Sequence, residues 1–591
     1  MHKNIGHFIG FSDGKRKLEL VILILLIVLT SCVEVLSISA VLPFLSVLFS
    51  DGSKYEYYQL LNYFPHFAIH GHFREIVILG FLIFTVLAGL LRVVVLRMSF
   101  RLSFKIAAEI SLKIYEQSIR QPYDAYVATT SSHLISTIIA KVNTVVYSFV
   151  MQVINLIAST IISVSILGLL FYISLPITCL VLGSFFILYY PILSFTKKNI
   201  ARDSSDLSKL SNDVVEFIQE THGAYREILI NGNRDAFIEK FKCIDNPLRN
   251  LQGKIVFLST YPRYIVEMLG MIIIILLSYY YVESGTNFIE ILPILAAVAI
   301  ASQRLLPLFQ QAYSAWANMQ MSKVVFLEVL ELLTKQQDDS NNALSERIDF
   351  KRSIKFHNVF YKYPGAKEFS LKNISFEINA GDKVGIVGDT GSGKTTLIDL
   401  MMGLLEPTSG EIYIDDVILN TKKIKSWRSN IALVPQSIFL FNKSVRENII
   451  LTNPNPNPNP NTNISEEIAR ALEISHLEDV VSKLYCGLEF VVGERGVRLS
   501  GGEKQRIGIA RAVFKNSNFV IMDEGTSAMD IGTESKIISA LIKDATKYDG
   551  KTILMIAHRL ETLKYCNKIL ELKGGCLKKI TNSIESLCDG S

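Results

Sequence analysis

Cysteine is scarce in this chain, and none of its cysteines is spaced as a metal ligand or a redox pair. The seven cysteines among 591 residues lie far apart, no CxxC occurs, and their number is odd. This pattern indicates reduced, structural thiols rather than a disulfide framework. A basic block is also lacking, because the 60 lysines and arginines nearly balance the 55 acidic residues. Nothing therefore suggests a nucleic-acid partner.

We also expect no cleavable secretion signal. Lys15, Arg16 and Lys17 precede an apolar stretch that runs past Ala40, which is too long for the core of a signal peptide. Apolar residues are what the chain has in abundance, at 49% of its length. A membrane portion is the simplest cause of such a composition, and the length predicts at least two domains.

Six stretches are apolar enough and long enough to cross a bilayer. They lie at about 18–49, 75–100, 143–169, 171–196, 254–282 and 288–318. The connecting segments 101–142 and 197–253 carry many basic residues, whereas 50–75 and 283–287 carry few or none. Because basic segments stay in the cytoplasm, we expect both termini on that side.

The two basic segments have helical rather than disordered patterns. One amphipathic pattern continues the second span from Ser99 to Gln121 and is broken at Pro122-Tyr123-Asp124. The other runs from Ser204 to about Phe241 and is broken near His222-Gly223. Long helices that project from the membrane and turn once predict a surface for a cytoplasmic partner. The alternative is an ordinary surface helix.

The apolar character ends after Leu333. We divide the chain into a membrane domain at 1–333, a polar linker at 334–347 and a soluble α/β domain at 348–591, where strands and helices alternate. The Asn-Pro repeat at 453–463 cannot form helix or interior strand, so we expect an exposed loop.

The strongest chemical motif is a P-loop of the form GxxxxGK[ST] between an expected strand and an expected helix. Its residues are Gly388, Asp389, Thr390, Gly391, Ser392, Gly393, Lys394, Thr395 and Thr396. Backbone N–H groups of such a loop wrap phosphate oxygens, and the helix N-terminus adds positive charge. Lys394 is expected on the β- and γ-phosphates of ATP, and the Thr395 hydroxyl on Mg²⁺.

A buried strand ends in two carboxylates about 130 residues later, in Phe519-Val-Ile-Met-Asp523-Glu524. Asp523 is suited to hold Mg²⁺ through water. Glu524 is suited to act as the general base, or to position the water that attacks the γ-phosphate.

The segment LSGGEKQR, with Ser500, Gly501 and Gly502, resembles the signature of ABC-type ATPases almost letter for letter. The resemblance implies that these residues bind the γ-phosphate of a nucleotide held by the P-loop of another subunit. It therefore implies a nucleotide-sandwich dimer, for which a homodimer with two active sites is the economical reading.

Further positions match the family pattern. The resemblance assigns Tyr363 to adenine stacking, Gln436 to the Q-loop that senses Mg²⁺ and water, and His558 to γ-phosphate contact. It also assigns Glu494 to a loop facing the membrane helices and 527–530 to the D-loop. One departure is Gly525, where the family usually has Ala.

Six spans followed by one nucleotide domain resemble an ABC exporter half-transporter over essentially the whole chain. The expected fold is an α-helical membrane domain of six transmembrane helices joined to an α/β P-loop ABC nucleotide-binding domain. The six spans exclude a soluble ABC protein of translation or DNA repair. No peptidase domain precedes the first span, which weakens the case for a peptide substrate.

Charged residues within the spans point to the cargo, because charges in a membrane usually face a cavity or a partner. Arg92, Arg263 and Arg304 lie well inside apolar runs, and their guanidinium groups suit phosphate or pyrophosphate. The alternative is pairing within the membrane, of Arg263 with Glu267 or of an arginine with Glu34.

Short segments resemble the membrane domain of PglK-type lipid-linked oligosaccharide flippases. They are Val33–Leu36 with Pro43-Phe44, Pro262-Arg263 with Glu267 and Gly270, Arg304–Pro307, and the aromatic loop Tyr55–Phe64. The resemblance implies outward flipping of a polyprenyl-pyrophosphate-linked glycan across a bacterial inner membrane, driven by ATP and Mg²⁺. The alternatives are an exporter of another lipid, a drug or a peptide, or an ATP-gated channel or regulatory subunit.

Overall fold

The computed structural model divides the chain into two compact units, which are described separately. The first unit contains Met1–Ile119 and Thr129–Gln336, and the second contains Arg120–Ala128 and Gln337–Ser591. The described residues are 14–41, 44, 73–127, 131–173, 175, 178, 183, 191, 203, 205–283, 288–334, 348, 350–450, 464–526, 528–547, 550–556 and 560–582.

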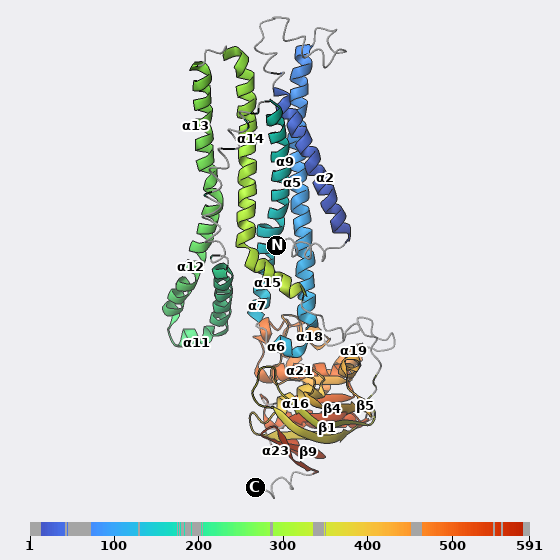
Figure 1. Cartoon of the computed structure of the whole chain (residues 1–591). Coiled ribbons are helices and arrows are strands. Elements are labelled where there is room, and N and C mark those ends of the chain that lie inside the picture. Colours follow the sequence, from blue (N-terminus) through green and yellow to red (C-terminus); the bar gives the residue numbers. More distant parts are fainter. Residues whose placement is uncertain are drawn as a thin grey trace. The chain divides into compact units, whose positions relative to one another are not determined.

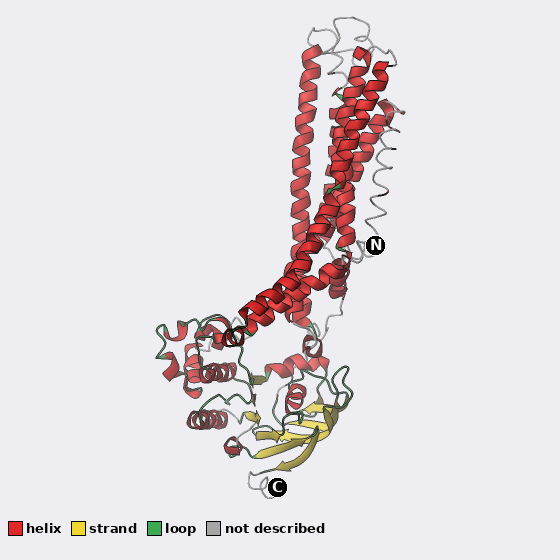
Figure 2. Cartoon of the chain, turned by 90° about the vertical axis from the view of Figure 1, so that its left-hand side faces the viewer, coloured by secondary structure: helices red, strands yellow, loops and turns green. Residues whose placement is uncertain are grey.

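Every described element of the first unit is helical (Figures 1 and 2). The elements are α2 Gly14–Ser39, α5 Phe73–Arg120, α7 Ser131–Ser136, α8 Val142–Val145, α9 Met151–Ile173, α11 Tyr225–Ile230, α12 Arg234–Thr260, α13 Pro262–Glu283, α14 Phe288–Met321 and α15 Lys323–Thr334. Residues 205–223 are helical apart from this series.

Three of the expected spans are confirmed as helices with the length and apolarity to cross a membrane. They are Gly14–Ser39, Glu75–Arg120 and Leu134–Tyr172. The stretch expected at 171–196 lies mostly outside the described residues. The stretch expected at 254–282 is not one helix: α12 ends at Thr260 and α13 begins at Pro262. The proline ring removes one backbone donor, which accounts for the break.

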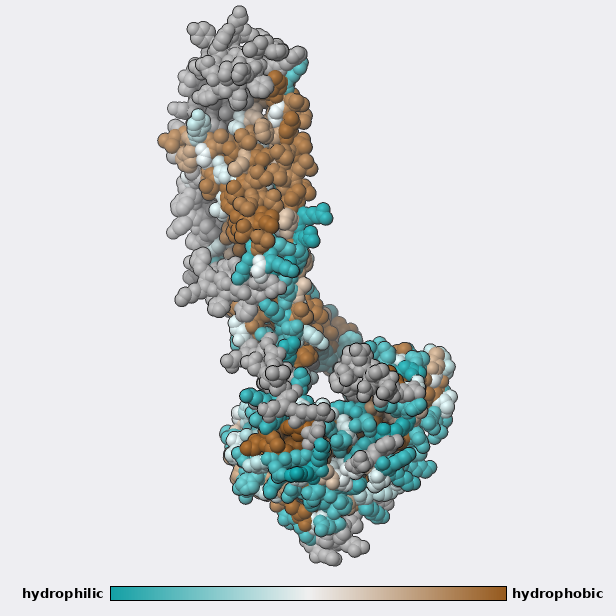
Figure 3. Space-filling view, turned by 90° about the vertical axis from the view of Figure 1, so that its right-hand side faces the viewer, coloured by the Kyte–Doolittle hydropathy of each residue, from teal (hydrophilic) through white to brown (hydrophobic). Residues whose placement is uncertain are grey.

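Helix α9 packs against both α2 and α14, and these helices run side by side in Figure 1. The apolar core that these helices share with α15 and the turn Val146–Val150 includes Leu23, Phe149 and Phe326, and the rings of Phe149 and Phe326 stack at 3.9 Å. On the face shown in Figure 3, apolar side chains (brown) form a broad band on this unit. An exterior of this kind belongs in lipid rather than in water.

A partly buried ion pair joins α15 to the third span. Lys141, with 6% of its side chain exposed, lies in a π-helical turn at Thr137–Lys141 and donates to Glu328 of α15 at 2.8 Å. Ser208 donates to the same carboxylate at 3.0 Å. A second π-helical turn follows at Val146–Val150. Such bulges re-aim side chains within a helix and often mark functional segments.

The break expected at Pro122 is confirmed, because α5 ends at Arg120 and a short helix, α6 Tyr123–Val127, begins three residues later. This helix belongs to the second unit, where Tyr123 packs against the hydrophobic core. Burial and the nearby charge of Asp399 raise the pKa of the Tyr123 hydroxyl. The segment is thus part of the second unit, and its role as a partner surface stays a prediction.

The second unit contains two sheets (Figure 2). A four-stranded antiparallel sheet has the order β2-β1-β4-β5, with β1 Ser353–Tyr361, β2 Leu371–Asn379, β4 Ser409–Ile414 and β5 Val417–Ile418. A six-stranded sheet has the order β10-β9-β3-β8-β7-β6, with β3 Lys383–Gly388, β6 Ile431–Val434, β7 Phe519–Asp523, β8 Thr552–Ile556, β9 Lys568–Lys573 and β10 Cys576–Thr581.

Burial explains why the two sheets differ. Strand β2 alternates between buried and exposed residues, as a sheet with one covered face requires. Strand β8 is buried at every position, as in a parallel sheet covered on both faces. Strands β6, β7, β8, β3 and β9 are parallel, so their carboxyl ends share one edge.

Helices surround the six-stranded sheet. They are α16 Lys394–Met401, α17 Thr421–Ser429, α18 Val445–Ile450, α19 Ile464–Ile474, α20 Glu478–Val481, α21 Gly501–Lys515, α22 Ile531–Lys547 and α23 Leu560–Leu563, with 3₁₀ turns at Gly487–Glu489 and Glu494–Gly496.

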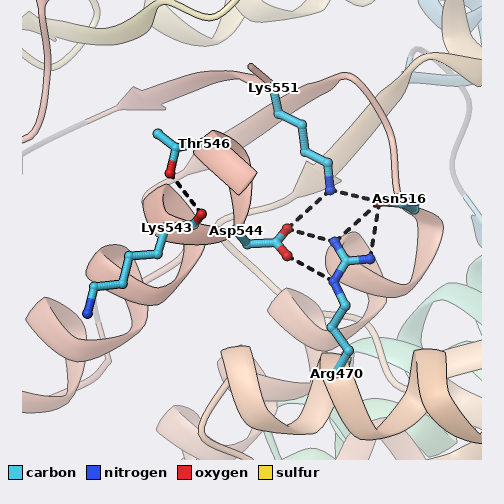
Figure 4. A network of polar contacts seen from close by, with 6 residues as sticks. All are labelled: Arg470, Asn516, Lys543, Asp544, Thr546 and Lys551. Carbon is cyan, nitrogen blue, oxygen red and sulfur yellow. Dashed lines mark hydrogen bonds and ion pairs between the residues drawn. The ribbon is translucent and has the colours of Figure 1, made fainter. Parts of the chain in front are cut away.

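A buried cluster of charges joins three of these helices (Figure 4). Asp544 of α22 accepts hydrogen bonds from Arg470 of α19 at 2.7 Å and from Lys551 at 3.2 Å, and Lys551 also donates to Asn516 at the end of α21. Burial opposes ionisation of Asp544, but the Arg470 hydrogen bond and the Lys551 charge outweigh it, so the pKa of Asp544 lies below its ordinary value.

We expect Asp544→Asn to destabilise the second unit by about 3 kcal/mol, because it leaves two buried cations without their counter-ion. A lowered carboxyl pKa also means that the stabilisation is present above pH 3.8, the ordinary value, and is lost as the pH falls through the lowered pKa. The Asn variant lacks this acid dependence. Thermal unfolding of the full-length protein as a function of pH measures both effects.

Asp416→Asn is the matched control. Asp416 pairs with Arg352 on the surface at 3.3 Å, and 81% of its side chain is exposed. Its loss is expected to change stability by no more than about 0.5 kcal/mol. Equal destabilisation by the two substitutions would show that the Asp544 cluster is not a structural joint.

Candidate functional site

The P-loop joins β3 to α16 in a conformation that glycine makes possible. Gly391 and Gly393 have φ values of 81° and 100°, in the left-handed region. A Cβ at Gly393 would also lie 2.7 Å from Leu371 Cδ2 and 3.0 Å from the Ser370 carbonyl oxygen. The loop therefore keeps its backbone N–H groups at the N-terminus of α16, where an anion is favoured.

Two side chains of this loop are suited to phosphate. Lys394 folds back over the loop, and its ammonium donates to the carbonyls of Gly388 at 2.6 Å and Asp389 at 3.1 Å. Ser392 is 3% exposed, and among the described residues its hydroxyl has no hydrogen-bond partner. A buried polar atom of this kind is costly unless a ligand satisfies it, so the loop fits a polyphosphate.

Tyr363, expected to stack on adenine, lies beside the P-loop helix. Its hydroxyl is 3.2 Å from the Thr396 hydroxyl, and its ring meets Tyr361 edge-on at 5.0 Å. These contacts place the half-buried Tyr363 beside the first turn of α16. Stacking on a base remains a prediction.

Gln436 and Glu524 are 88 residues apart in sequence and are brought into direct contact. The Gln436 amide donates to a Glu524 carboxylate oxygen at 2.7 Å. Glu524 has a φ of 50°, which costs a non-glycine residue about 1 kcal/mol or more. Strained residues of this kind cluster at active sites, which agrees with the expected role of Glu524 as the base.

Two acidic side chains, Asp399 and Asp523, interact electrostatically at the P-loop helix α16. Asp523 ends β7, and Asp399 lies buried on α16. Burial, and then the charge of Asp523, raises the pKa of Asp399 to about 6. The described ranges contain no cluster of three or more His, Cys, Asp or Glu side chains that would hold a metal alone. A Mg²⁺ ion shared with phosphates needs fewer protein ligands, and Thr395, Asp523 and Gln436 fit that role.

The signature segment forms the N-terminus of α21, as expected. Ser500 is the N-cap and makes a capping box with Glu503, whose carboxylate accepts from the Ser500 N–H at 2.7 Å. Ser500 and Gly501 are exposed. The 15-residue helix thus presents an exposed, capped and positively polarised end, suited to the phosphate of another subunit.

Some expected positions lie outside the described residues: His558, Ser527, Pro43, Tyr55–Phe64 and the repeat at 453–463. Sequence reasoning missed other contacts around the site. Thr526 and Thr562 both donate to the buried Glu534 carboxylate, at 2.9 and 3.0 Å. The Gln505 side chain accepts from the Ala528 N–H at 2.9 Å. No motif spacing signals these pairs, because only the fold brings them together.

The three expected substrate arginines differ in their surroundings. Arg263 pairs with Glu267 at 2.8 Å, one turn along α13, with about half of its side chain exposed. Arg92 forms an ion pair with Glu34, whose side chain is 3% exposed. Both pairings are the alternative that the sequence left open. Arg304 is half-buried, and its Nη1 has no hydrogen-bond partner within the described part of the chain.

Arg304, Arg92 and Glu34 line the same cavity, of about 390 Å³, between α2, α5, α9 and α14. Gln303, Gln311 and Asn155 add amide groups to its wall. Sequence reasoning missed these amides, since uncharged polar residues in a span give a weak signal. Arg263 is not among the lining residues.

Comparisons with known proteins agree with this architecture. A family model described as "ABC transporter" matches residues 371–527, and one described as "ABC transporter transmembrane region" matches residues 20–305. The chain is 30% identical over 424 residues to the ATP-dependent lipid A-core flippase of Pectobacterium atrosepticum, covering 70% of this chain and 69% of the relative. It is 26% identical over 502 residues to the protein of that name from Albidiferax ferrireducens, covering 83% of each.

The fold is also that of a solved exporter. The structure of a bacterial Atm1-family ABC exporter with ATP bound matches 98% of this chain and 97% of its own chain, with a TM-score of 0.77 and 20% identity. Membrane helices, P-loop, signature and acidic strand end thus occur together, in the order that both family models require. The chain belongs to the ABC transporters, as an exporter half-transporter whose ATPase domain drives transport across a membrane.

Proposed function

We propose that this exporter flips a lipid whose saccharide head group carries phosphate, from the cytoplasmic to the outer leaflet of a bacterial inner membrane. The cargo class expected from the sequence is a polyprenyl-pyrophosphate-linked oligosaccharide. The protein acts as a homodimer with both termini in the cytoplasm, residues 1–333 forming the membrane domain and 348–591 the ATPase domain.

The observation that carries this proposal is Arg304 at the cavity: its Nη2 donates to Ser37 at 3.4 Å, whereas its buried Nη1 has no hydrogen-bond partner among the described residues. A buried donor without a partner is costly, and an arginine fork binds phosphate oxygens in two parallel hydrogen bonds. The lining amides of Gln303, Gln311 and Asn155 both donate and accept hydrogen bonds, as sugar hydroxyls require.

The Arg92–Glu34 pair supports the same reading. It shows that this cavity already accommodates an anionic oxygen group next to an arginine. A phosphate entering the cavity would meet Arg304 directly and would compete with Glu34 for Arg92. Arg263, expected as a third substrate residue, pairs with Glu267 away from this cavity and contributes less to the proposal.

The names of the relatives fit the same chemistry. A lipid A-core flippase acts, by its name, on a lipid of this broad kind. Lipid A-core and a lipid-linked oligosaccharide share hydrocarbon tails and a phosphorylated saccharide head. We therefore propose the class of lipid that both belong to, and the flipping assay described below distinguishes lipid A-core from a lipid-linked oligosaccharide.

At the ATPase site we propose that Glu524 acts as the base and His558 contacts the γ-phosphate. The P-loop from Gly388 to Thr396 and Tyr363 bind ATP, and Gln436 joins Thr395 and Asp523 at Mg²⁺. Ser500, Gly501 and Gly502 complete the site of the second copy. The contact between Gln436 and Glu524 supports this assignment, because it joins the metal-sensing amide to the base.

We expect Glu524→Gln to bind ATP as the wild-type protein does and to hydrolyse it at least about 100-fold more slowly, because the amide cannot accept a proton. Steady-state phosphate release and binding of a fluorescent ATP analogue by the purified full-length protein measure the two properties. Turnover near the wild-type rate would show that another group is the base.

We expect Arg304→Ala to lower flipping in proteoliposomes by about tenfold or more, because a charge-assisted contact to phosphate is lost. Arg92→Ala is expected to have a smaller effect, since Glu34 shares that arginine. Arg304→Lys keeps the charge but loses the fork, and it is expected to recover only part of the activity. The readout is protection of a labelled head group from an external enzyme.

Arg97→Ala is the matched control, because Arg97 lies on the same helix as Arg92 but does not line the cavity.

Flipping is measured in parallel for a polyprenyl-pyrophosphate oligosaccharide, lipid A-core, an uncharged lipid and a hydrophobic drug. Wild-type flipping by Arg304→Ala and Arg92→Ala contradicts the phosphate contact. Preference for the drug or uncharged lipid supports the alternative exporter, and single-channel currents would support the channel alternative.

A further inference from the structure

We propose that Gly525 is a positioning residue for ATP hydrolysis: its lack of a side chain lets the turn after Glu524 pack directly on Val434, which holds Glu524 against Gln436. The resemblance to ABC-type ATPases leads us to expect alanine at this position. The structure supplies a physical reason for the glycine that does not involve backbone freedom.

The contact is closer than any side chain would allow. A Cβ at residue 525 would lie 2.6 Å from Val434 Cγ1 and 3.2 Å from Val434 Cβ. Gly525 is buried, and Val434 is 1% exposed. The φ of Gly525 is not positive, so an alanine would suit the backbone. Space, rather than conformation, is what requires glycine here.

Val434 cannot easily move away from an added methyl group. It is the last residue of β6 and pairs in register with Met522 of β7, the strand that leads to Glu524. As a β-branched residue it has a stiff χ1 angle, so a rotamer change offers little relief. The sheet therefore holds the backbone of Val434, and the cavity that Val434 lines in the described part of the chain is small, about 20 Å³.

The turn that carries Gly525 is fixed on its other side. The Thr526 hydroxyl donates to Glu534 at 2.9 Å, and Glu534 is 7% exposed on α22. Thr562 donates to the same carboxylate oxygen. A shift of the turn away from Val434 would disturb this buried hydrogen-bonded group.

The two contacting residues flank the catalytic pair. Val434 lies two positions before Gln436, and Gly525 directly follows Glu524. The φ of Glu524 is 50°, which is already an unfavourable value for a residue other than glycine. A methyl group at 525 must therefore displace Glu524 or Gln436 and lengthen their 2.7 Å hydrogen bond. A misplacement of about 1 Å at a catalytic group can cost about 100-fold in rate.

The test is a double-mutant cycle on the full-length transporter in proteoliposomes, with Gly525→Ala, Val434→Ala and the two combined. We expect Gly525→Ala to lower kcat for ATP at least about tenfold while KM and ATP binding change less than about threefold. The added Val434→Ala removes the opposing methyl groups, so the double variant is expected to regain most of the lost kcat.

Gly532→Ala is the matched control: a Cβ there would meet only Asp530 Oδ2, at 3.4 Å, so wild-type turnover is expected. Wild-type turnover by Gly525→Ala, or a double variant no more active than Gly525→Ala, overturns the proposal. Should Gly525→Ala fail to fold, recovery of a folded, active double variant supports the proposal, and failure of that variant overturns it.

Discussion

The parallel register of the six-stranded sheet is the constraint on which the nucleotide site depends. Because β6, β7, β8 and β3 run in the same direction, their carboxyl ends meet at one edge. That edge carries the P-loop after β3, the acidic pair at the end of β7 and Gln436 just past β6. The hydrogen bond between Gln436 and Glu524 is a direct product of this arrangement. Glycines and strained dihedrals occur where these ends crowd together, at Gly393, Glu524 and Gly525.

In both units, charged side chains that are largely buried pair with opposite charges. In the second unit, Arg470, Asp544 and Lys551 satisfy one another, and the cluster ties helices to the sheet. In the first unit, Lys141 and Glu328 form a similar joint, and Arg92 with Glu34 is paired within a cavity. Arg304 is the contrast among the described residues of that cavity, since its Nη1 lacks a partner. A structural role is expected to satisfy such a group, whereas a binding role leaves it available.

The chain enters the second unit briefly, at Arg120–Ala128, between two stretches of the first unit. Helix α6 follows directly after the long α5 and packs Tyr123 on the core of the second unit. The same region contains Asp399, whose pKa of about 6 reflects burial and the charge of Asp523. Burial, and then the charge of Asp399, raises the pKa of Tyr123.

The sequence by itself determined what depends on local pattern. Apolar length predicted the spans confirmed at Gly14–Ser39, Glu75–Arg120 and Leu134–Tyr172, and spacing predicted the P-loop, the capped signature helix and the acidic strand end. Only the tertiary structure decided which distant groups meet. Arg92 and Arg263 form ion pairs, and Arg304 lies at a cavity. The expected fifth span is interrupted at Tyr261, and Gly525 packs against Val434. The physical reason is that periodicity and motif spacing reflect interactions between chain neighbours, whereas ion pairs and side-chain clearances depend on packing between segments far apart in the sequence.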